Sequence, residues 1–146
     1  MSKSRWTTAV ALAVGLMIPL SVFAQEITVW RSFACGCCHL WAKHLEASGM
    51  SVKMIDANDL AKIKAERGIS SELAACHTAV VAGYAIEGHV PAKEIRRLLA
   101  ERPDAIGLAV PGMPNDAPGM DSDSKEPFDV LLVKKDGSTA IFAKYQ

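Results

Sequence analysis

The chain has 146 residues, of which 16 are Lys or Arg and 16 are Asp or Glu, so its formal net charge is zero. A balanced charge without a basic stripe is not typical of nucleic-acid-binding proteins, and we expect no nucleic-acid partner. The length is that of one domain, sufficient to bury a core without disulfide staples. The four cysteines are therefore free to have a functional role.

Residues 1–24 have the layout of a secretory signal peptide. Lys3 and Arg5 precede an apolar run, and Ala24 is a small residue at the expected cleavage site. A membrane anchor is the alternative, but a proline breaks the run, which is short for a span of about 20 residues. We therefore expect residues 25–146 to form a soluble, exported domain without a membrane span.

Strand and helix patterns alternate through this domain. Strands are predicted at residues 26–30, 51–56, 78–82 and 84–86, and helices at residues 37–48, 58–67 and 91–101. Asn58 is expected to cap the second helix, with Leu60 and Ile63 facing inward. The order of elements is that of a thioredoxin/glutaredoxin-like α/β domain, a mixed sheet with flanking helices. Such a topological analogy does not by itself give a function.

Two segments complete the predicted domain. Residues 102–126 are rich in proline and glycine and predict a long irregular Pro/Gly loop. Residues 128–133 and 139–142 flank an Asp-Gly turn and predict a C-terminal β-hairpin.

The cysteines lie in two places, Cys35-Gly-Cys-Cys-His39 and Cys76-His77. The first segment falls between the first strand and the first helix, and the second immediately precedes the third strand. In a thioredoxin-like fold these two places face each other, so we expect the sulfurs to meet in space. Thiols at a helix N-terminus are favoured as thiolates, the form that binds soft metals and attacks disulfides.

Cys35 and Cys38 are spaced Cys-x-x-Cys, so a thiol-disulfide oxidoreductase is one interpretation. Such an enzyme needs neither Cys37 nor Cys76, and it usually has a proline in the facing loop, where this chain has none. A purely structural disulfide is a second interpretation, but bridges among the crowded cysteines close very small loops and remove little unfolded-state entropy. Scattered carboxylates give no support to a metal-free hydrolase.

A metal site is the third interpretation. Zinc prefers four tetrahedral ligands with paired cysteines two to four residues apart, which makes Cys-x-Cys-Cys crowding unfavourable for it. Copper fits better, because Cu(I) prefers thiolate and thioether sulfur whereas Cu(II) accepts imidazole. Crowded thiolates can also bridge several Cu(I) ions.

Five segments form a specific combination: Cys35-Gly-Cys-Cys-His-Leu-Trp41, Cys76-His-Thr-Ala-Val80, residues 88–99 (Gly-His-Val-Pro-Ala-Lys-Glu-Ile-Arg-Arg-Leu-Leu), residues 107–114 (Gly-Leu-Ala-Val-Pro-Gly-Met-Pro) and Pro118-Gly-Met120. In this combination the chain resembles the CopG-type periplasmic copper-resistance proteins, from about residue 27 to residue 142. The resemblance implies a thioredoxin-like fold and a copper site on the cysteines, with a cluster of several ions as one form of it. It also implies a part in copper tolerance, through sequestration, transfer or a copper oxidoreductase activity. Asn115-Asp-Ala117 departs from the family's small-residue stretch between the two methionine motifs.

The resemblance implies metal thiolates at Cys35, Cys37, Cys38 and Cys76. The neighbouring imidazoles and the loop thioethers are further candidate ligands: His39, His77, Met113 and Met120. His44 is expected on the surface, and His89 is expected to form hydrogen bonds in a turn. The implied location is the periplasm, and the implied partners are copper ions and copper-efflux or copper-chaperone proteins.

Overall fold

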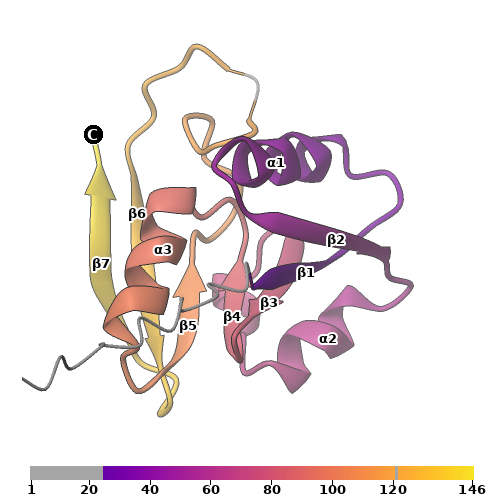
Figure 1. Cartoon of the computed structure of the whole chain (residues 1–146). Coiled ribbons are helices and arrows are strands. Elements are labelled where there is room, and N and C mark those ends of the chain that lie inside the picture. Colours follow the sequence, from indigo (N-terminus) through magenta and orange to yellow (C-terminus); the bar gives the residue numbers. More distant parts are fainter. Residues whose placement is uncertain (1–24, 121) are drawn as a thin grey trace, which may run out of the picture.

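The computed structural model describes residues 25–120 and 122–146, so the predicted signal peptide, residues 1–24, lies outside the described residues (Figure 1). The strands are β1 (Glu26–Arg31), β2 (Ser51–Asp56), β3 (His77–Val81), β4 (Tyr84–Glu87), β5 (Ala105–Ala109), β6 (Phe128–Lys134) and β7 (Thr139–Tyr145). The helices are α1 (Gly36–Ala47), α2 (Leu60–Glu66), α3 (Ala92–Glu101) and the short 3-10 turn η1 (Ser71–Leu73). Within the described part of the chain, no helix has the length and apolar character needed to cross a bilayer.

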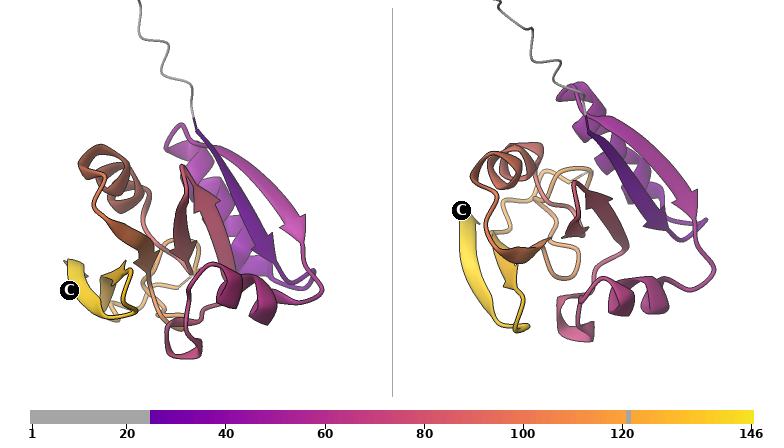
Figure 2. Two further views of the ribbon diagram at one scale, coloured as in Figure 1. Left: turned by 90° about the horizontal axis from the view of Figure 1, so that it is seen from below. Right: turned by 60° about the horizontal axis from the view of Figure 1, so that its bottom comes forward.

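One mixed sheet of seven strands organises the molecule, in the order β2-β1-β3-β4-β5-β6-β7. β1 pairs parallel with β2, and β4 pairs parallel with β5, while the other neighbours are antiparallel. Helices α1 and α3 cover one face and α2 lies on the other (Figures 1 and 2). The predicted mixed sheet with flanking helices and C-terminal hairpin is confirmed, and its thioredoxin-like assignment stays a prediction.

The expectation of irregular chain throughout residues 102–126 is wrong for β5. This apolar segment joins the two halves of the sheet, parallel to β4 and antiparallel to β6. Gly107 is required there, because a Cβ on it would lie 1.7 Å from the carbonyl oxygen of Ala85. The prolines on both sides of the segment made the composition of residues 102–126 typical of a loop, so the strand was not predicted. The irregular Pro/Gly loop is therefore shorter, and runs over residues 110–127 between β5 and β6.

The core lies between the sheet and the helices α1 and α3. Trp41 and Leu45 of α1 and Ile95 and Leu98 of α3 are fully buried in it. Full burial of one such side chain contributes about 1.5–3 kcal/mol. Trp41 and Leu45 lie four residues apart on α1 and fix it, with the cysteines at its first turn, against the sheet. Ile95 and Leu98 fix α3 in the same way.

Helix α2 differs from its prediction in two ways. Asp59 rather than Asn58 caps it, by accepting a hydrogen bond from the backbone N–H of Lys62 at 3.0 Å. Leu60 and Ile63 are only half-buried, whereas Lys64 is buried. A buried ammonium requires a partner, and this partner belongs to the site described below.

Candidate metal centre

The turn that carries Cys35 is held by a buried arginine at the end of β1. The Arg31 guanidinium donates to the carbonyls of Ser32 and Phe33, both at 3.0 Å, and pairs with Asp56 at 2.9 Å. Cys35 then occupies the N-cap of α1. Cys37 and Cys38 therefore lie in the first helical turn, one residue further into the helix than the sequence predicted.

The Cys76 segment is held by a buried carboxylate, Glu87 of β4. Its Oε1 accepts from the backbone N–H of Ala75 at 2.6 Å, and its Oε2 accepts from the Thr78 hydroxyl at 2.6 Å. The Lys64 ammonium donates to Glu87 Oε1 at 2.5 Å and to Thr78 Oγ1 at 2.9 Å. Burial raises the pKa of Glu87, and the hydrogen bonds from these partners oppose that rise. The Glu87 carboxylate thus fixes the chain on both sides of Cys76.

The four sulfurs meet in one place, as the fold prediction required. Cys37 Sγ lies 3.6 Å from Cys35 Sγ and 3.9 Å from Cys76 Sγ, and Cys38 Sγ lies 3.7 Å from Cys76 Sγ. All four sulfurs lie within 4.8 Å of one another. Cys35 and Cys38 form a disulfide, whereas Cys37 and Cys76 are free thiols.

Two buried imidazoles extend this group of sulfurs. Cys76 Sγ lies 3.3 Å from His77 Nδ1 and 3.1 Å from His89 Nε2, so Cys76 belongs to both groups of ligand atoms. The His77 ring also packs on Trp41, with ring centroids 4.3 Å apart. His77 Nε2 is buried and has no hydrogen-bond partner among residues 25–120 and 122–146.

His89 is the residue that the sequence analysis assigned otherwise. It does form a hydrogen bond, from Nδ1 to the carbonyl oxygen of Pro118 at 2.7 Å, but its other nitrogen faces Cys76. The signal that could have found it is hairpin register. Thr78 pairs with Glu87 in the β3–β4 hairpin, and continuing that register by two residues places His89 opposite Cys76.

Burial sets the protonation of these groups in the metal-free protein. Burial, followed by the charge that His89 carries when protonated and the Lys64 charge, lowers the pKa of His77 to about 3. Burial also lowers the pKa of His89. Burial, followed by the charge of Cys37 and a hydrogen bond with it, raises the pKa of Cys76 to about 12. Both imidazoles are therefore neutral at pH 7, and a metal that binds Cys76 must displace its proton.

The other predicted ligands lie at different distances from this centre. Met113 is exposed and lines a groove of about 420 Å³ with Cys35, Cys37 and Cys76. His39 is exposed and lies outside both groups of ligand atoms found in residues 25–120 and 122–146.

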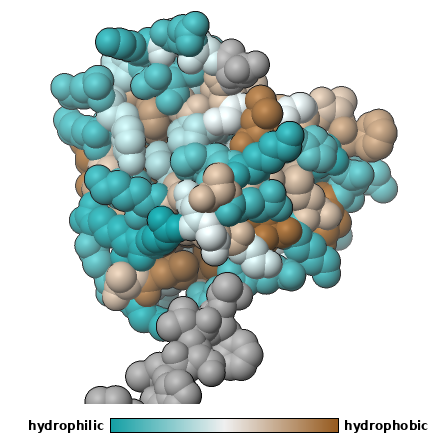
Figure 3. Space-filling view, turned by 45° about the horizontal axis from the view of Figure 1, so that its top comes forward, coloured by the Kyte–Doolittle hydropathy of each residue, from teal (hydrophilic) through white to brown (hydrophobic). Residues whose placement is uncertain are grey.

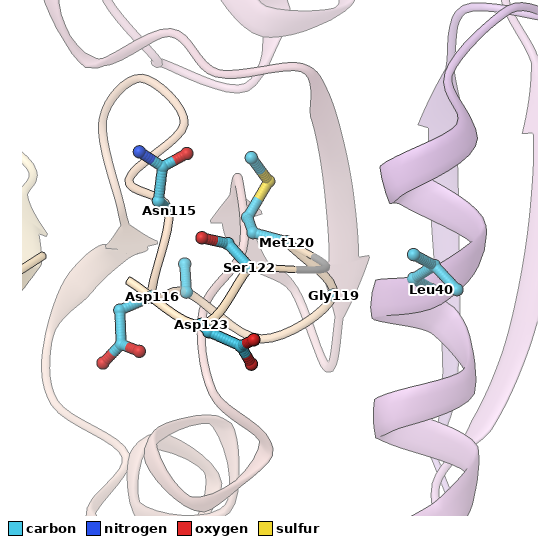
Figure 4. Close-up of a pocket in the computed structure, with 8 residues that line it drawn as sticks. Leu40, Asn115, Asp116, Gly119, Met120, Ser122 and Asp123 are labelled. Carbon is cyan, nitrogen blue, oxygen red and sulfur yellow. The ribbon is translucent and has the colours of Figure 1, made fainter. Parts of the chain in front are cut away.

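Met120 and His44 have surroundings of their own. Met120 packs against the core and lines a separate pocket of about 360 Å³ with Leu40 of α1 and Asn115 of the loop (Figure 4). His44 was expected on the surface, but it is half-buried and accepts a hydrogen bond from the Ala92 backbone N–H at 3.1 Å.

The chain is similar to one protein family and to two solved structures. Residues 73–120 match the family described as "Protein of unknown function, DUF411". Two solved structures, titled "Copper resistance protein copG- Form 2" and "Copper resistance protein copG- Form 1", are 39% and 40% identical to this chain. Their TM-scores are 0.79 and 0.78; they cover 84% and 82% of this chain, and the matches span 98% and 96% of their own chains.

This chain belongs to the CopG family. The DUF411 match includes Cys76, His77 and His89 but begins after the Cys35–Cys38 segment. The CopG structures match most of the chain, so the family assignment does not depend on either cysteine segment alone. No curated protein matches the chain.

Proposed function

We propose that this CopG-family protein binds copper on Cys35, Cys37, Cys38 and Cys76 and contributes to copper resistance by sequestration, transfer or a change of copper oxidation state. The observation that carries the proposal is the convergence of four sulfurs within 4.8 Å, in a chain 39% identical to a copper resistance protein. The proposed location is the periplasm, where copper-efflux or copper-chaperone proteins would be its exchange partners.

The donor set favours copper over zinc. Sulfur separations of 3.6–3.9 Å suit one ion at a metal–sulfur distance of about 2.3 Å, and zinc would accept this spacing. Zinc also accepts imidazole, so the donor that separates the two metals is thioether sulfur, which suits Cu(I). Met113 lines the groove at the sulfurs, and His77 and His89 face Cys76. Thiolates favour Cu(I) and neutral imidazoles accept Cu(II), so the combination is compatible with either oxidation state.

Copper binding by all four cysteines requires the reduced protein. A dithiol reductant, which is itself oxidised to a disulfide, supplies the two electrons and two protons that convert the Cys35–Cys38 disulfide into two thiols, and metal binding then displaces protons from the thiols. The disulfide form retains only Cys37 and Cys76 as free thiols. Copper affinity should therefore depend on the redox state of the Cys35–Cys38 pair.

A competition titration tests the proposal. Reduced protein is mixed anaerobically with Cu(I) and a chromophoric Cu(I) chelator, and the affinity is compared among wild type, Cys76→Ser and His39→Ala. We expect Cys76→Ser to weaken binding most, because Cys76 belongs to both groups of ligand atoms. His39→Ala is the matched control, because His39 is exposed outside both groups. Equal affinity in wild type and Cys76→Ser would contradict the proposal.

Thiol-disulfide exchange is the second candidate function, and the Cys35–Cys38 disulfide is the observation that favours it. Cys35 is half-buried at the N-cap of α1, while Cys38 is fully buried behind it. An accessible first sulfur can form the mixed disulfide with a substrate, and a protected second sulfur can then resolve it. Insulin reduction separates the two functions: strong turnover without copper uptake favours exchange, and copper uptake with negligible turnover favours the copper site.

A further inference from the structure

The turn formed by Pro118 and Gly119 lies directly on the backbone of α1. Gly119 has φ +85°, and a Cβ there would lie 2.5 Å from the backbone nitrogen and 2.8 Å from the Cα of Trp41. Such distances leave no room for a side chain, so glycine is required by contact as well as by conformation. Neither the DUF411 description nor the proposed thiolate site gives this turn a role.

The same turn orients an imidazole. The carbonyl oxygen of Pro118 lies 2.7 Å from His89 Nδ1. A carbonyl only accepts hydrogen bonds, so Nδ1 carries the proton of the neutral ring, and Nε2 is left with a lone pair. That lone pair faces Cys76 Sγ at 3.1 Å. His89 is fully buried, so solvent does not compete for either nitrogen.

Trp41 connects the turn to the chain beside His89. Its indole Nε1 donates to the carbonyl oxygen of Val90 at 2.9 Å, and its backbone is the surface on which Gly119 rests. The residue after His89 and the turn that accepts from its ring are therefore both fixed to one residue of α1. Both contacts favour the ring orientation in which Nε2 faces Cys76.

We propose that the Pro118–Gly119 turn is a positioning element that presents His89 Nε2 as a nitrogen ligand to copper bound at Cys76. The inference rests on the proposed copper-binding function and adds to it a role for the Pro-Gly-Met motif. A backbone carbonyl that holds the far nitrogen of a ligating histidine is a common outer-shell arrangement in metal sites. Loss of such a partner typically costs about 10–100-fold in metal affinity.

Gly137, in the turn between β6 and β7, offers a matched control outside the site. It has almost the same positive φ as Gly119, +83°, but a Cβ on it would meet nothing within 4 Å. Gly137→Ala therefore introduces the same kind of backbone strain as Gly119→Ala without displacing the Pro118–Gly119 turn from α1. A difference in copper affinity between the two variants is then due to the contact with α1 and not to the replacement of a positive-φ glycine.

The test combines Cu(I) affinity with a double-mutant cycle. Cu(I) competition titrations are made on reduced wild type, Gly119→Ala, Gly137→Ala, His89→Ala and the Gly119→Ala/His89→Ala double variant. We expect Gly119→Ala to lower affinity by about 10–100-fold, Gly137→Ala to retain wild-type affinity, and Gly119→Ala to have no further effect without His89. An equal loss with and without His89, or wild-type affinity in Gly119→Ala, overturns the inference. Absence of Cu(I) binding by wild type would instead overturn the proposed function and this ligand role together.

A second measurement needs no variant. Long-range ¹H–¹⁵N correlation spectra of the reduced, metal-free wild type report which nitrogen of His89 carries the proton. We expect the proton on Nδ1 and an unprotonated Nε2. A proton on Nε2 overturns the inference, whatever the folding behaviour of Gly119→Ala.

Discussion

Buried neutral histidines should make the stability of the metal-free protein fall as the pH drops below neutrality. His77 is fully buried against Trp41, and its pKa is lowered from 6.5 to about 3, chiefly by burial. Between these two pH values the unfolded chain binds a proton that the folded chain does not. The free energy of unfolding therefore rises with pH across this window, and the contribution is lost as the pH falls from 6.5 towards 3.

The magnitude follows from the size of the shift. Each pH unit within the window changes the free energy of unfolding by about 1.4 kcal/mol. Acidification from pH 6.5 to pH 5 should thus cost about 2 kcal/mol through His77 alone, a large part of a typical stability of about 5–15 kcal/mol. His89, whose pKa is also lowered by burial, acts in the same direction.

Urea unfolding followed by tryptophan fluorescence is the assay, on metal-free protein in chelator with the disulfide intact. Wild type is compared with His77→Phe at half-unit steps from pH 7 to pH 4.5. Phenylalanine keeps a ring against Trp41 but cannot be protonated. We expect the pH dependence of the free energy of unfolding to weaken by about 1.4 kcal/mol per pH unit in His77→Phe. Equal slopes in the two proteins would refute the reasoning.

Two further predictions concern stability and ligands. Lys64→Met should lower the free energy of unfolding by about 3–5 kcal/mol, because it leaves the buried Glu87 carboxylate without its cation. The control Lys62→Met removes an exposed ion pair and should change the free energy of unfolding by less than about 1 kcal/mol. Similar denaturation midpoints for the two variants would contradict this account. Met113→Leu should weaken Cu(I) binding in a competition titration, because Met113 lines the groove at the sulfurs. Met120→Leu should leave the Cu(I) affinity unchanged, because Met120 packs against the core and lines a separate pocket. A larger loss of Cu(I) affinity in Met120→Leu than in Met113→Leu would count against the groove as part of the site.

The face of the molecule shown in Figure 3 is mainly hydrophilic, with hydrophobic side chains in separate patches. Phe33, Leu40 and Met113 are the exposed large hydrophobic residues within residues 33–113. Met113 lines the groove with Cys35, Cys37 and Cys76, so an exposed apolar side chain and the sulfur donors share this groove.

Local sequence signals were sufficient for the elements that carry the cysteines. The strand before Cys35, the helix after it and the β3–β4 hairpin each have their own periodicity or turn residues, and the fold prediction then placed Cys76 opposite the first cluster. The strand, the helix and the hairpin are confirmed, and each depends mostly on neighbouring residues. The approach of Cys76 to the first cysteines is also confirmed, but its prediction came from the order of the elements and not from local sequence.

The features that were missed depend on strands far apart in the sequence. β5 is a short apolar segment between prolines, and its strand conformation is fixed by pairing with β4 and β6. The buried ammonium of Lys64 is stabilised by Glu87, which is 23 residues away in the sequence. His89 is aimed by the carbonyl of Pro118, 29 residues away. No local pattern contains these partners, so local propensity could not assign the roles.

The measurement that tests the central claim most directly is copper K-edge X-ray absorption on the reduced protein loaded with Cu(I). The account requires a first coordination shell dominated by sulfur, which diminishes when Cys76 is replaced by serine. A shell made only of oxygen and nitrogen atoms, or a sulfur shell that is the same in wild type and Cys76→Ser, would contradict it.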